Sequence, residues 1–329
     1  MKKLFLLISF ITIVSQLSFS QKDSISQPIV EIFTDFHVNL QKNDSKTTGF
    51  SINRAYFGYN YAFDKNFYTV LLLNIGSPDD LAAGSKPKRY AYFREASIDY
   101  SDDRISFFAG MISTELFAFQ QRFLGMRYLA NTFQDRNGYG FDADLGAEVK
   151  FKFSDTFQAD LSLLNGEGSS SLQLDNNLKS SLGLTFTPSH NTALRLYGDI
   201  MKLNGVWQNT FLAFAGYKTD KYFLGGEFNF KTSLDTINGH NAWGISATGG
   251  FSITEKWMIF SRYDISRSVV PAGVDGDWNF KKDNSFLIAG IQYRISKMIK
   301  VAADYQGIFP DDPAKTISNM IYLNASLKF

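Results

Sequence analysis

Apolar and polar residues alternate along most of the chain, in segments of about ten residues. In "LGAEVKFKF" at 145–153, apolar side chains occupy every second position, whereas Glu148 and Lys150 lie on the other face. The segment "FQADLSLL" at 157–164 repeats the pattern after the short turn "SDT". Two alternating segments joined by a short turn predict a β-hairpin with one apolar face.

The same alternation predicts about sixteen strands, and the connections between them alternate in length. The strands are expected at 29–40, 50–63, 66–75, 89–101, 104–112, 142–153, 156–164, 178–187, 192–201, 208–218, 222–231, 242–253, 256–266, 284–296, 298–308 and 319–329. The longer connections are 41–49, 76–88, 113–141, 165–177, 202–207, 232–241, 267–283 and 309–318. Short turns at one rim and long loops at the other are typical of an up-and-down transmembrane barrel.

The end of the chain, "MIYLNASLKF", supports a closed barrel rather than an open sheet. Its last strand alternates as strictly as the others and stops at Phe329. Because an unpaired strand edge is not tolerated in lipid, this strand is expected to pair with the first. A soluble β-sandwich also alternates, but its turns would not sort into two length classes. The predicted fold class is therefore all-β, an antiparallel transmembrane barrel of about sixteen strands.

The beginning of the chain is typical of a secretory signal peptide. Two Lys residues precede an apolar run at 4–14, and small residues at 18–20 fit a cleavage site. The apolar run is too short to span a bilayer as a helix. We expect a signal peptide at 1–20 and a barrel domain at 21–329, with both termini on the periplasmic, short-turn side.

Composition excludes several classes of protein. The chain has 33 Lys and Arg against 32 Asp and Glu, so it carries no basic excess for nucleic acid. It has no Cys, and therefore neither a disulfide nor a cysteine-linked lipid holds it. Aromatic residues make up 16% of the chain and gather beside the short turns, as an interfacial girdle would.

Four segments in the first half resemble the phosphate-selective porin family (porins O and P), in the branch common among Bacteroidetes. They are "FSINRAYFGYNYAF" at 50–63, "REASIDY" at 94–100, "RISFFAGM" at 104–111 and "LLNGEG" at 163–168. The resemblance implies a homotrimer of sixteen-stranded barrels in outer-membrane lipid, each a diffusion channel with the long third loop folded into the lumen. It also implies that Phe329 is an assembly signal read by the barrel-assembly machinery.

The face opposite the apolar one supplies the predicted pore wall. Candidate inward residues of both signs are Arg54, Glu95, Lys150, Arg195 and Arg262. Acids and bases nearly balance over all such positions, whereas a phosphate-selective path would be lined by an excess of Arg and Lys. We expect most of these charges to pair between neighbouring strands and to keep the pore wet.

The longest connection, 113–141, is the candidate constriction. Apolar residues recur in it at helical spacing, which would anchor it to the wall, and polar residues lie between them. The predicted constriction residues are Arg122, Arg127, Gln120, Gln121, Arg136 and Glu115. The bases outnumber the acids here, which predicts a slight preference for anions. A surface flap over the pore mouth is the alternative for this segment.

Other chemistry has little support in the sequence. The three His residues (His37, His190 and His240) fall in unrelated segments, so we expect no metal site, cofactor or catalytic triad. Asp135 and Asp144 bound a polar stretch with oxygen ligands for Ca²⁺, but it lacks the spacing of a calcium loop. A channel for small ions and solutes is therefore favoured, and a barrel with an enzymatic or surface-binding role is the alternative.

Overall fold

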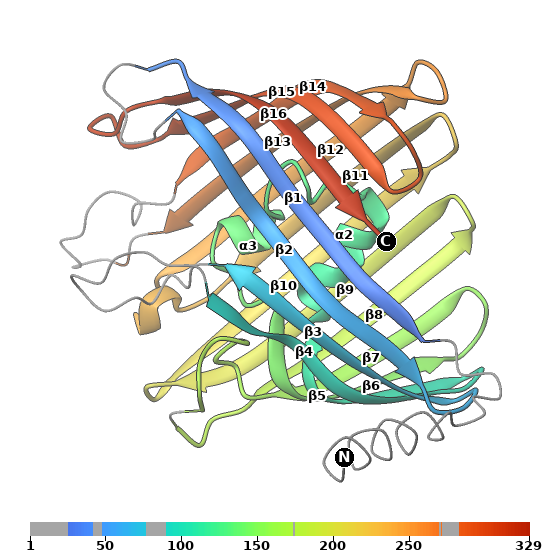
Figure 1. The fold of residues 1–329 in the computed structure, drawn as a ribbon. Coiled ribbons are helices and arrows are strands. Elements are labelled where there is room, and N and C mark those ends of the chain that lie inside the picture. The colour runs from blue at the N-terminus through green and yellow to red at the C-terminus, as the bar shows by residue number, and fades with distance from the viewer. Residues whose placement is uncertain (1–25, 42–47, 77–89, 174, 270, 272–282) are drawn as a thin grey trace, which may run out of the picture.

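Sixteen antiparallel strands close into a barrel in the computed structural model, which describes residues 26–41, 48–76, 90–173, 175–269, 271 and 283–329 (Figure 1). The strands are β1 (Gln27–Asn39), β2 (Gly49–Ala62), β3 (Phe67–Gly76), β4 (Tyr90–Ser101), β5 (Ile105–Ser113), β6 (Ala143–Lys152), β7 (Phe157–Leu164), β8 (Lys179–Ser189), β9 (Thr192–Leu203), β10 (Val206–Lys218), β11 (Tyr222–Lys231), β12 (Asn241–Ser252), β13 (Trp257–Val269), β14 (Asn284–Arg294), β15 (Ile299–Pro310) and β16 (Ser318–Lys328). Each strand pairs with its neighbours in sequence.

The predicted strands are confirmed, with every end within three residues of the observed one. The alternation of short and long connections is confirmed wherever the structure describes them, except between β9 and β10. There the predicted loop at 202–207 is wrong: β9 and β10 extend to a two-residue turn, in which Asn204 and Gly205 reverse the chain with positive φ angles of 50° and 82°. Parts of four predicted long loops lie outside the described residues, which leave out 42–47, 77–89, 174, 270 and 272–282. The predicted signal peptide at 1–20 lies outside them as well.

Pairing of β1 with β16 closes the barrel, as the sequence predicts. Val30 N–H donates to the carbonyl oxygen of Phe329 at 2.9 Å, and Phe329 N–H donates to the carbonyl oxygen of Val30 at 3.0 Å. The register continues to Asn39 opposite Met320. The last residue of the sequence therefore takes part in the closing ladder.

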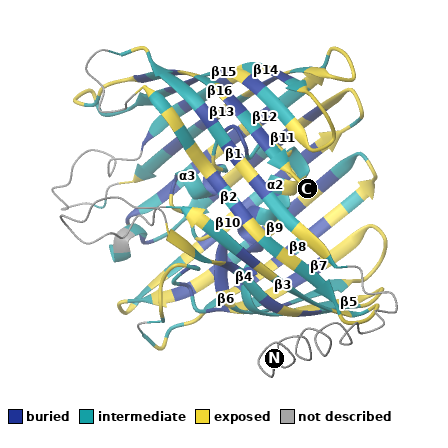
Figure 2. Cartoon of the chain, in the orientation of Figure 1, coloured by how far each residue is buried: buried dark blue, intermediate teal, exposed yellow. Residues whose placement is uncertain are grey.

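The two faces of the wall differ in chemistry. Along β7 and β9, Asp160 and Arg195 are buried on the inner face, whereas Leu161 and Leu194 are exposed on the outer face. Figure 2 shows the resulting alternation of buried and exposed residues along the strands. A sheet with polar residues inside and apolar residues outside is the arrangement of a barrel whose solvent is lipid.

Aromatic rings meet beside several short turns. Phe153 and Phe157 have ring centroids 5.6 Å apart, and those of Trp257 and Tyr293 are 4.6 Å apart. The turns themselves are held by side-chain acceptors: Asp102 Oδ1, for example, accepts from the backbone N–H of Ile105 at 2.8 Å. Short polar turns with local acceptors allow the chain to reverse within a few residues.

Helices are short and lie in connections. Between β5 and β6 the chain forms α2 (Glu115–Leu124) and α3 (Phe133–Arg136), and η1 (Leu234–Thr236) lies between β11 and β12. The helical spacing seen in the sequence of the longest connection is thus confirmed by α2. Within the described residues, no helix is long and apolar enough to cross a membrane.

Candidate functional site

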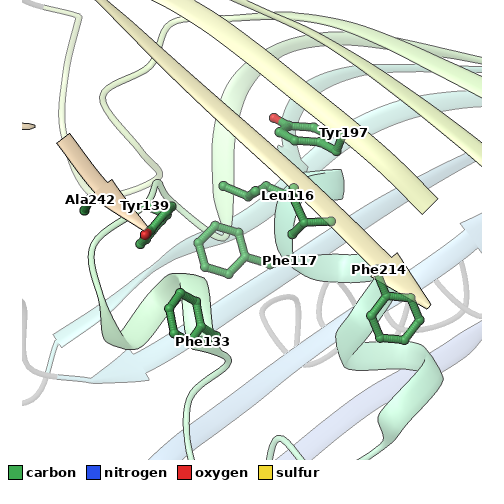
Figure 3. Close-up of a cluster of buried hydrophobic side chains, with 8 residues drawn as sticks. Leu116, Phe117, Phe133, Tyr139, Tyr197, Phe214 and Ala242 are labelled. Carbon is green, nitrogen blue, oxygen red and sulfur yellow. The ribbon is translucent and has the colours of Figure 1, made fainter. Parts of the chain in front are cut away.

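The connection between β5 and β6 contacts the polar face of strands on the far side of the barrel. Leu116, Phe117, Phe133 and Tyr139 of this connection pack against Tyr197, Leu212, Phe214 and Ala242, which belong to β9, β10 and β12 (Figure 3). These residues lie about a hundred positions further along the chain. Of the apolar residues at helical spacing, Leu116 belongs to this cluster, and Phe119 and Phe123 pack against it. The sequence alone did not identify the wall that they contact.

Glycines of the wall make room for this apolar contact. A Cβ at Gly244 would lie 2.0 Å from Cζ of Phe133, and one at Gly216 would lie 2.4 Å from Cε1 of Phe123. Since no side chain tolerates such distances, only glycine lets these phenyl rings rest on the strand backbone. Gly244 is thus the position on the wall where Phe133 of α3 packs.

A second apolar cluster holds the stretch between the two helices. Tyr128 and Leu129 pack there against Phe33, Phe260, Phe286, Ile288 and Ala302 of β1, β13, β14 and β15. The hydroxyl group of Tyr128 donates to Gln292 Oε1 at 2.8 Å. The connection consequently contacts both the β9–β12 side and the β13–β1 side of the inner wall.

Long side chains of the wall donate to backbone carbonyl groups of the connection. Lys218 Nζ lies 2.8 Å from the Phe123 oxygen, and Arg262 Nη1 lies 2.7 Å from the Asn131 oxygen. Gln306 of β15 donates to the Leu129 oxygen at 3.1 Å. Irregular backbone in a partly buried place needs such partners, because unpaired buried carbonyl groups are costly. A neutral carbonyl group does not cancel the charge of Lys218, whereas the charge of Arg262 is balanced by Asp264.

Arg94 fastens the end of the connection. Its Nη2 donates to the Asp142 carbonyl oxygen at 2.7 Å, and its Nε lies 3.2 Å from Asp142 Oδ2. Strict alternation would turn Arg94 outward, because its neighbour Glu95 faces inward. A β-bulge shifts the register between Leu72 and Leu73, so that Arg94 is buried as well. The sequence analysis missed Arg94, although an Arg on an apolar outer face would have indicated such a bulge.

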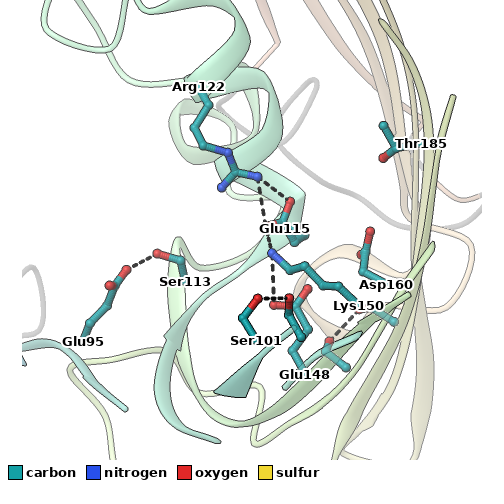
Figure 4. A network of polar contacts seen from close by, with 12 residues as sticks. Glu95, Ser101, Ser113, Glu115, Arg122, Glu148, Lys150, Asp160 and Thr185 are labelled. Atoms are coloured by element: carbon teal, nitrogen blue, oxygen red, sulfur yellow. Dashed lines mark hydrogen bonds and ion pairs between the residues drawn. The ribbon is translucent and has the colours of Figure 1, made fainter. Parts of the chain in front are cut away.

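Glu115 is the centre of a charged network at the start of α2 (Figure 4). Its carboxylate accepts from Arg122 Nη2 at 3.0 Å and from Lys150 Nζ at 2.5 Å. Burial opposes ionisation of this carboxyl group, but Lys150 and Arg122 outweigh that effect and lower its pKa to about 2. Glu115 therefore ties α2 to β6 rather than facing the open lumen.

Acidification to about pH 4 is expected to leave this anchor intact. A depressed pKa means that the ion pairs contribute fully above the ordinary Glu value and are lost only as the pH falls through about 2. Single-channel conductance measured from pH 7 to pH 4 should therefore show no step that depends on Glu115. A step in that range that disappears in Glu115→Gln would contradict the assignment.

The predicted constriction residues have two kinds of environment. The side chain of Arg122 is 60% exposed, and Gln121 is partly exposed. Gln120 is buried and donates to the Leu116 oxygen, Arg127 pairs with Asp135 at 3.0 Å, and Arg136 lies over the Phe286 ring at 3.8 Å. Arg122 and Gln121 thus offer polar groups to solvent. Gln120, Arg127 and Arg136 instead make contacts that stabilise the connection.

The predicted wall charges have partners, but among their ion pairs only that of Arg54 joins neighbouring strands as expected. Arg195 of β9 pairs with an acid on β7, and Arg262 pairs with an acid on its own strand. Arg54 lies 3.0 Å from Glu31, and Arg195 forms two hydrogen bonds with Asp160 at 2.7 and 2.9 Å. Arg262 is bound to Asp264 in the same two-pronged way. Glu95 accepts a hydrogen bond from Ser113, and Lys150 pairs with Glu115 and Glu148. These residues stabilise the wall and the base of the connection.

Basic side chains gather at the short-turn end of the lumen. Two cavities of about 660 and 350 Å³ open there, beside Gly125 and Met126 at the end of α2. Their basic lining residues are Arg122, Arg127, Lys218, Lys221, Arg294, Lys297, Lys300 and Lys328. Their acidic lining residues are Glu31, Asp220 and Glu255. We call this region the basic vestibule; the sequence analysis did not anticipate it.

The acidic residues of the stretch from Asp135 to Asp144 have partners within the protein. Asp142 is held by Arg94, and Asp144 accepts from the backbone N–H groups of Leu145 and Gly166. In the part of the chain that the structure describes, no group of three His, Asp or Glu residues is placed to hold a metal ion. His37 contacts Asp35 at 2.6 Å, whereas His190 lies in an exposed turn and His240 is buried near Leu234.

Comparison with known proteins supports the fold. Similar solved structures include Salmonella typhi OmpF in complex with daunomycin (TM-score 0.67, 12% identity, covering 92% of this chain and 97% of that one). A mutant porin of Rh. blastica (0.60, 12%, 93% and 100%) and the trimer form of the Vibrio cholerae outer membrane protein OmpT (0.62, 13%, 94% and 100%) are also similar.

The sequence matches no protein-family model. No curated protein is similar enough in sequence to count as a relative. At these low identities the structural likeness shows a porin-like sixteen-stranded barrel. The resemblance to phosphate-selective porins is not confirmed by the comparisons.

Proposed function

We propose that this protein is an outer-membrane porin, a passive, water-filled diffusion channel for small hydrophilic solutes with a weak preference for anions. The observation that carries this proposal is the excess of basic over acidic residues in the vestibule, at the end of a barrel whose wall bases Arg54, Arg195 and Arg262 are paired with acids. Paired charges keep a pore wet without selecting a sign, whereas uncancelled charges attract the opposite ion.

The connection between β5 and β6 is proposed to fold into the lumen and form its narrowest part. Its contacts with inward-facing residues of β9–β15 and β1 support this arrangement. In a wide pore, exposed charges act over about a Debye length, ~8 Å at physiological salt. Beside a constriction, the charge of Arg122 would come within that distance of each passing ion.

The same proposal covers the cellular setting. A barrel with an apolar outer face fits outer-membrane lipid, and the porin-like fold supports that location. We propose export through the segment 1–20, insertion by the barrel-assembly machinery with Phe329 as its signal, periplasmic short turns, and assembly as a homotrimer. The trimer form of one structural neighbour supports the last point.

Phosphate is one anion among several that this channel is proposed to admit. The resemblance to the phosphate-selective porin family favours it, but the predicted wall bases Arg54, Arg195 and Arg262 are each paired with an acid, which lowers their attraction for phosphate. We therefore propose general anion preference, with no catalytic activity.

Reconstitution into a planar lipid bilayer tests the proposal. In a KCl gradient the reversal potential should have the sign of an anion-preferring channel, and replacing chloride by phosphate should still allow current. A heat-modifiable, folded barrel that conducts no ions would overturn the channel and favour an enzymatic or surface-binding role. Conduction with cation preference would overturn the assignment of the vestibule alone.

A further inference from the structure

A cavity of about 400 Å³ lies at the long-loop end of the lumen. The stretch 137–141, which follows α3, forms one side of it, and inward residues near the ends of β8–β13 form much of the other. We call it the outer cavity. Its volume is within the range of small-molecule sites, and its lining shares no residue with the basic vestibule at the opposite end of the barrel.

Glu167 lines the outer cavity from a turn between β7 and β8. Its neighbours Gly166 and Gly168 both have positive φ angles, 95° and 82°, which other residues rarely adopt. Gly166 N–H donates to Asp144 Oδ2 at 2.6 Å, and a Cβ at Gly168 would lie 2.7 Å from the Phe141 ring. The turn is therefore held against β6 and against Phe141, which fixes the backbone position of Glu167 in the cavity lining.

Lys179, the first residue of β8, lines the same side of the cavity. Its Cβ lies 3.6 Å from the position that a Cβ of Gly166 would take, which places it beside the turn of Glu167. Among the described residues, neither the Lys179 ammonium group nor the Glu167 carboxylate has an ion-pair or hydrogen-bond partner. Two opposite charges thus face one cavity without cancelling each other by direct contact.

The other two charged residues of the lining already have partners. Lys231 Nζ donates to two backbone carbonyl groups of the stretch after α3, at 3.1 and 3.3 Å. Asp283 Oδ2 accepts from the backbone N–H and the hydroxyl group of Ser268 at 2.7 and 3.0 Å. The charges of these two residues have opposite signs, so together they add no net charge to the cavity. Glu167 and Lys179 are therefore the charged groups that a ligand can pair with.

We propose that the outer cavity binds a small zwitterion, an α-amino acid with an apolar side chain. Its carboxylate pairs with Lys179 and its ammonium group with Glu167, while its side chain contacts the cavity-lining Met201 and Leu203 of β9. A singly charged ion would be attracted by one of the two charged residues and repelled by the other. A neutral polar molecule would leave both charges without a counterion. The site goes beyond the proposed diffusion channel, because it selects a solute by binding.

The binding experiment compares three molecules that share one apolar side chain. The full-length protein is folded in detergent and titrated near neutral pH with L-leucine, with isoamylamine, which lacks the carboxylate, and with 4-methylpentanoate, which lacks the ammonium group. Saturation-transfer NMR reports binding without any need for ion conduction. We expect saturable binding of leucine and about 3- to 10-fold weaker binding of each analogue, since each loses one ion pair and keeps one repulsion.

Two variants should change the preference in opposite directions. Glu167→Gln removes the acid, so it should weaken leucine binding about 3- to 10-fold and make 4-methylpentanoate bind better than isoamylamine. Lys179→Met removes the base and should give the reverse preference. Glu255→Gln and Lys221→Met are the matched controls, because they make the same replacements at exposed positions of the basic vestibule. They should leave leucine binding unchanged.

Failure of this site and failure of the channel give different results. A folded barrel that does not bind leucine, whether or not it conducts ions, would overturn the site. So would leucine binding that is no tighter than the binding of one of its analogues, or leucine binding that Glu167→Gln and Lys179→Met leave unchanged. Saturable leucine binding by a barrel that conducts no ions would instead support the site and overturn the channel.

Discussion

Replacing Lys221, Arg294 and Lys297 together by Glu is expected to turn the channel from anion preference to cation preference. All three line the basic vestibule and are exposed. Arg122 and Arg127 are left unchanged, because they also form ion pairs within the connection between β5 and β6. Three reversed charges acting over about one Debye length should shift the ratio of anion to cation permeability roughly 10-fold.

The measurement is the reversal potential in a KCl gradient, compared with that of wild type. Lys65, Arg104 and Lys152 provide the matched control, since they are exposed at or beside other short turns and their replacement by Glu changes the net charge equally. An equal shift in the control would mean that overall charge, rather than the vestibule, sets the ion preference. An unchanged potential in the vestibule variant would remove the basis for the proposed selectivity.

Gly244→Ala is expected to release α3 from the wall. The mean single-channel current should then increase, and its fluctuations should become larger. The added methyl group would meet the Phe133 ring, whose Cζ lies only 2.0 Å from its position. Overpacking of this kind costs about 1–3 kcal/mol, which changes the ratio of bound to released connection about 5- to 150-fold. Phe133→Ala removes the same contact from the other side and should act in the same direction.

The control for Gly244→Ala must introduce steric strain into the barrel wall without contacting the connection between β5 and β6. Gly290 meets this need, because the nearest neighbours of an added Cβ there are Asp304 and the Ala303 backbone. If Gly290→Ala changes the current as much as Gly244→Ala does, strain within the barrel is responsible. If neither Gly244→Ala nor Phe133→Ala alters the current, the connection does not narrow the conducting path.

The strands were predictable because their information is local. In a barrel, each strand faces lipid on one side and polar groups on the other. Apolar and polar residues therefore alternate with a period of two in every strand, and the alternation stops at the turns. The ends of β5 and β14 differ from the predicted ones by no more than two residues for this reason. The helical spacing that predicts α2 is local in the same sense.

The bulge opposite Arg94 shows where local reasoning fails. A one-residue shift exchanges the two faces of a strand, and alternation alone does not reveal where pairing skips a residue. Glu95 was predicted to face inward, and Arg94 was overlooked. Arg94 is nevertheless the residue that binds Asp142, and it also contacts Glu95.

The sequence by itself determined a closed barrel with sixteen strands, its short and long rims, the paired character of its wall and the importance of the longest connection. Only the tertiary structure decided which strands that connection meets, because its partners are distant in the sequence, up to 177 residues away for Leu129 and Gln306, and no local pattern identifies them. The need for glycine at position 244 is evident only once Phe133 is seen to pack on it. Likewise, the Lys218 side chain is recognised as a donor to a backbone carbonyl group only once Phe123 lies beside it. The basic vestibule likewise arises because closure of the barrel brings residues from β10, β14, β15 and β16 around one opening, where their charges add.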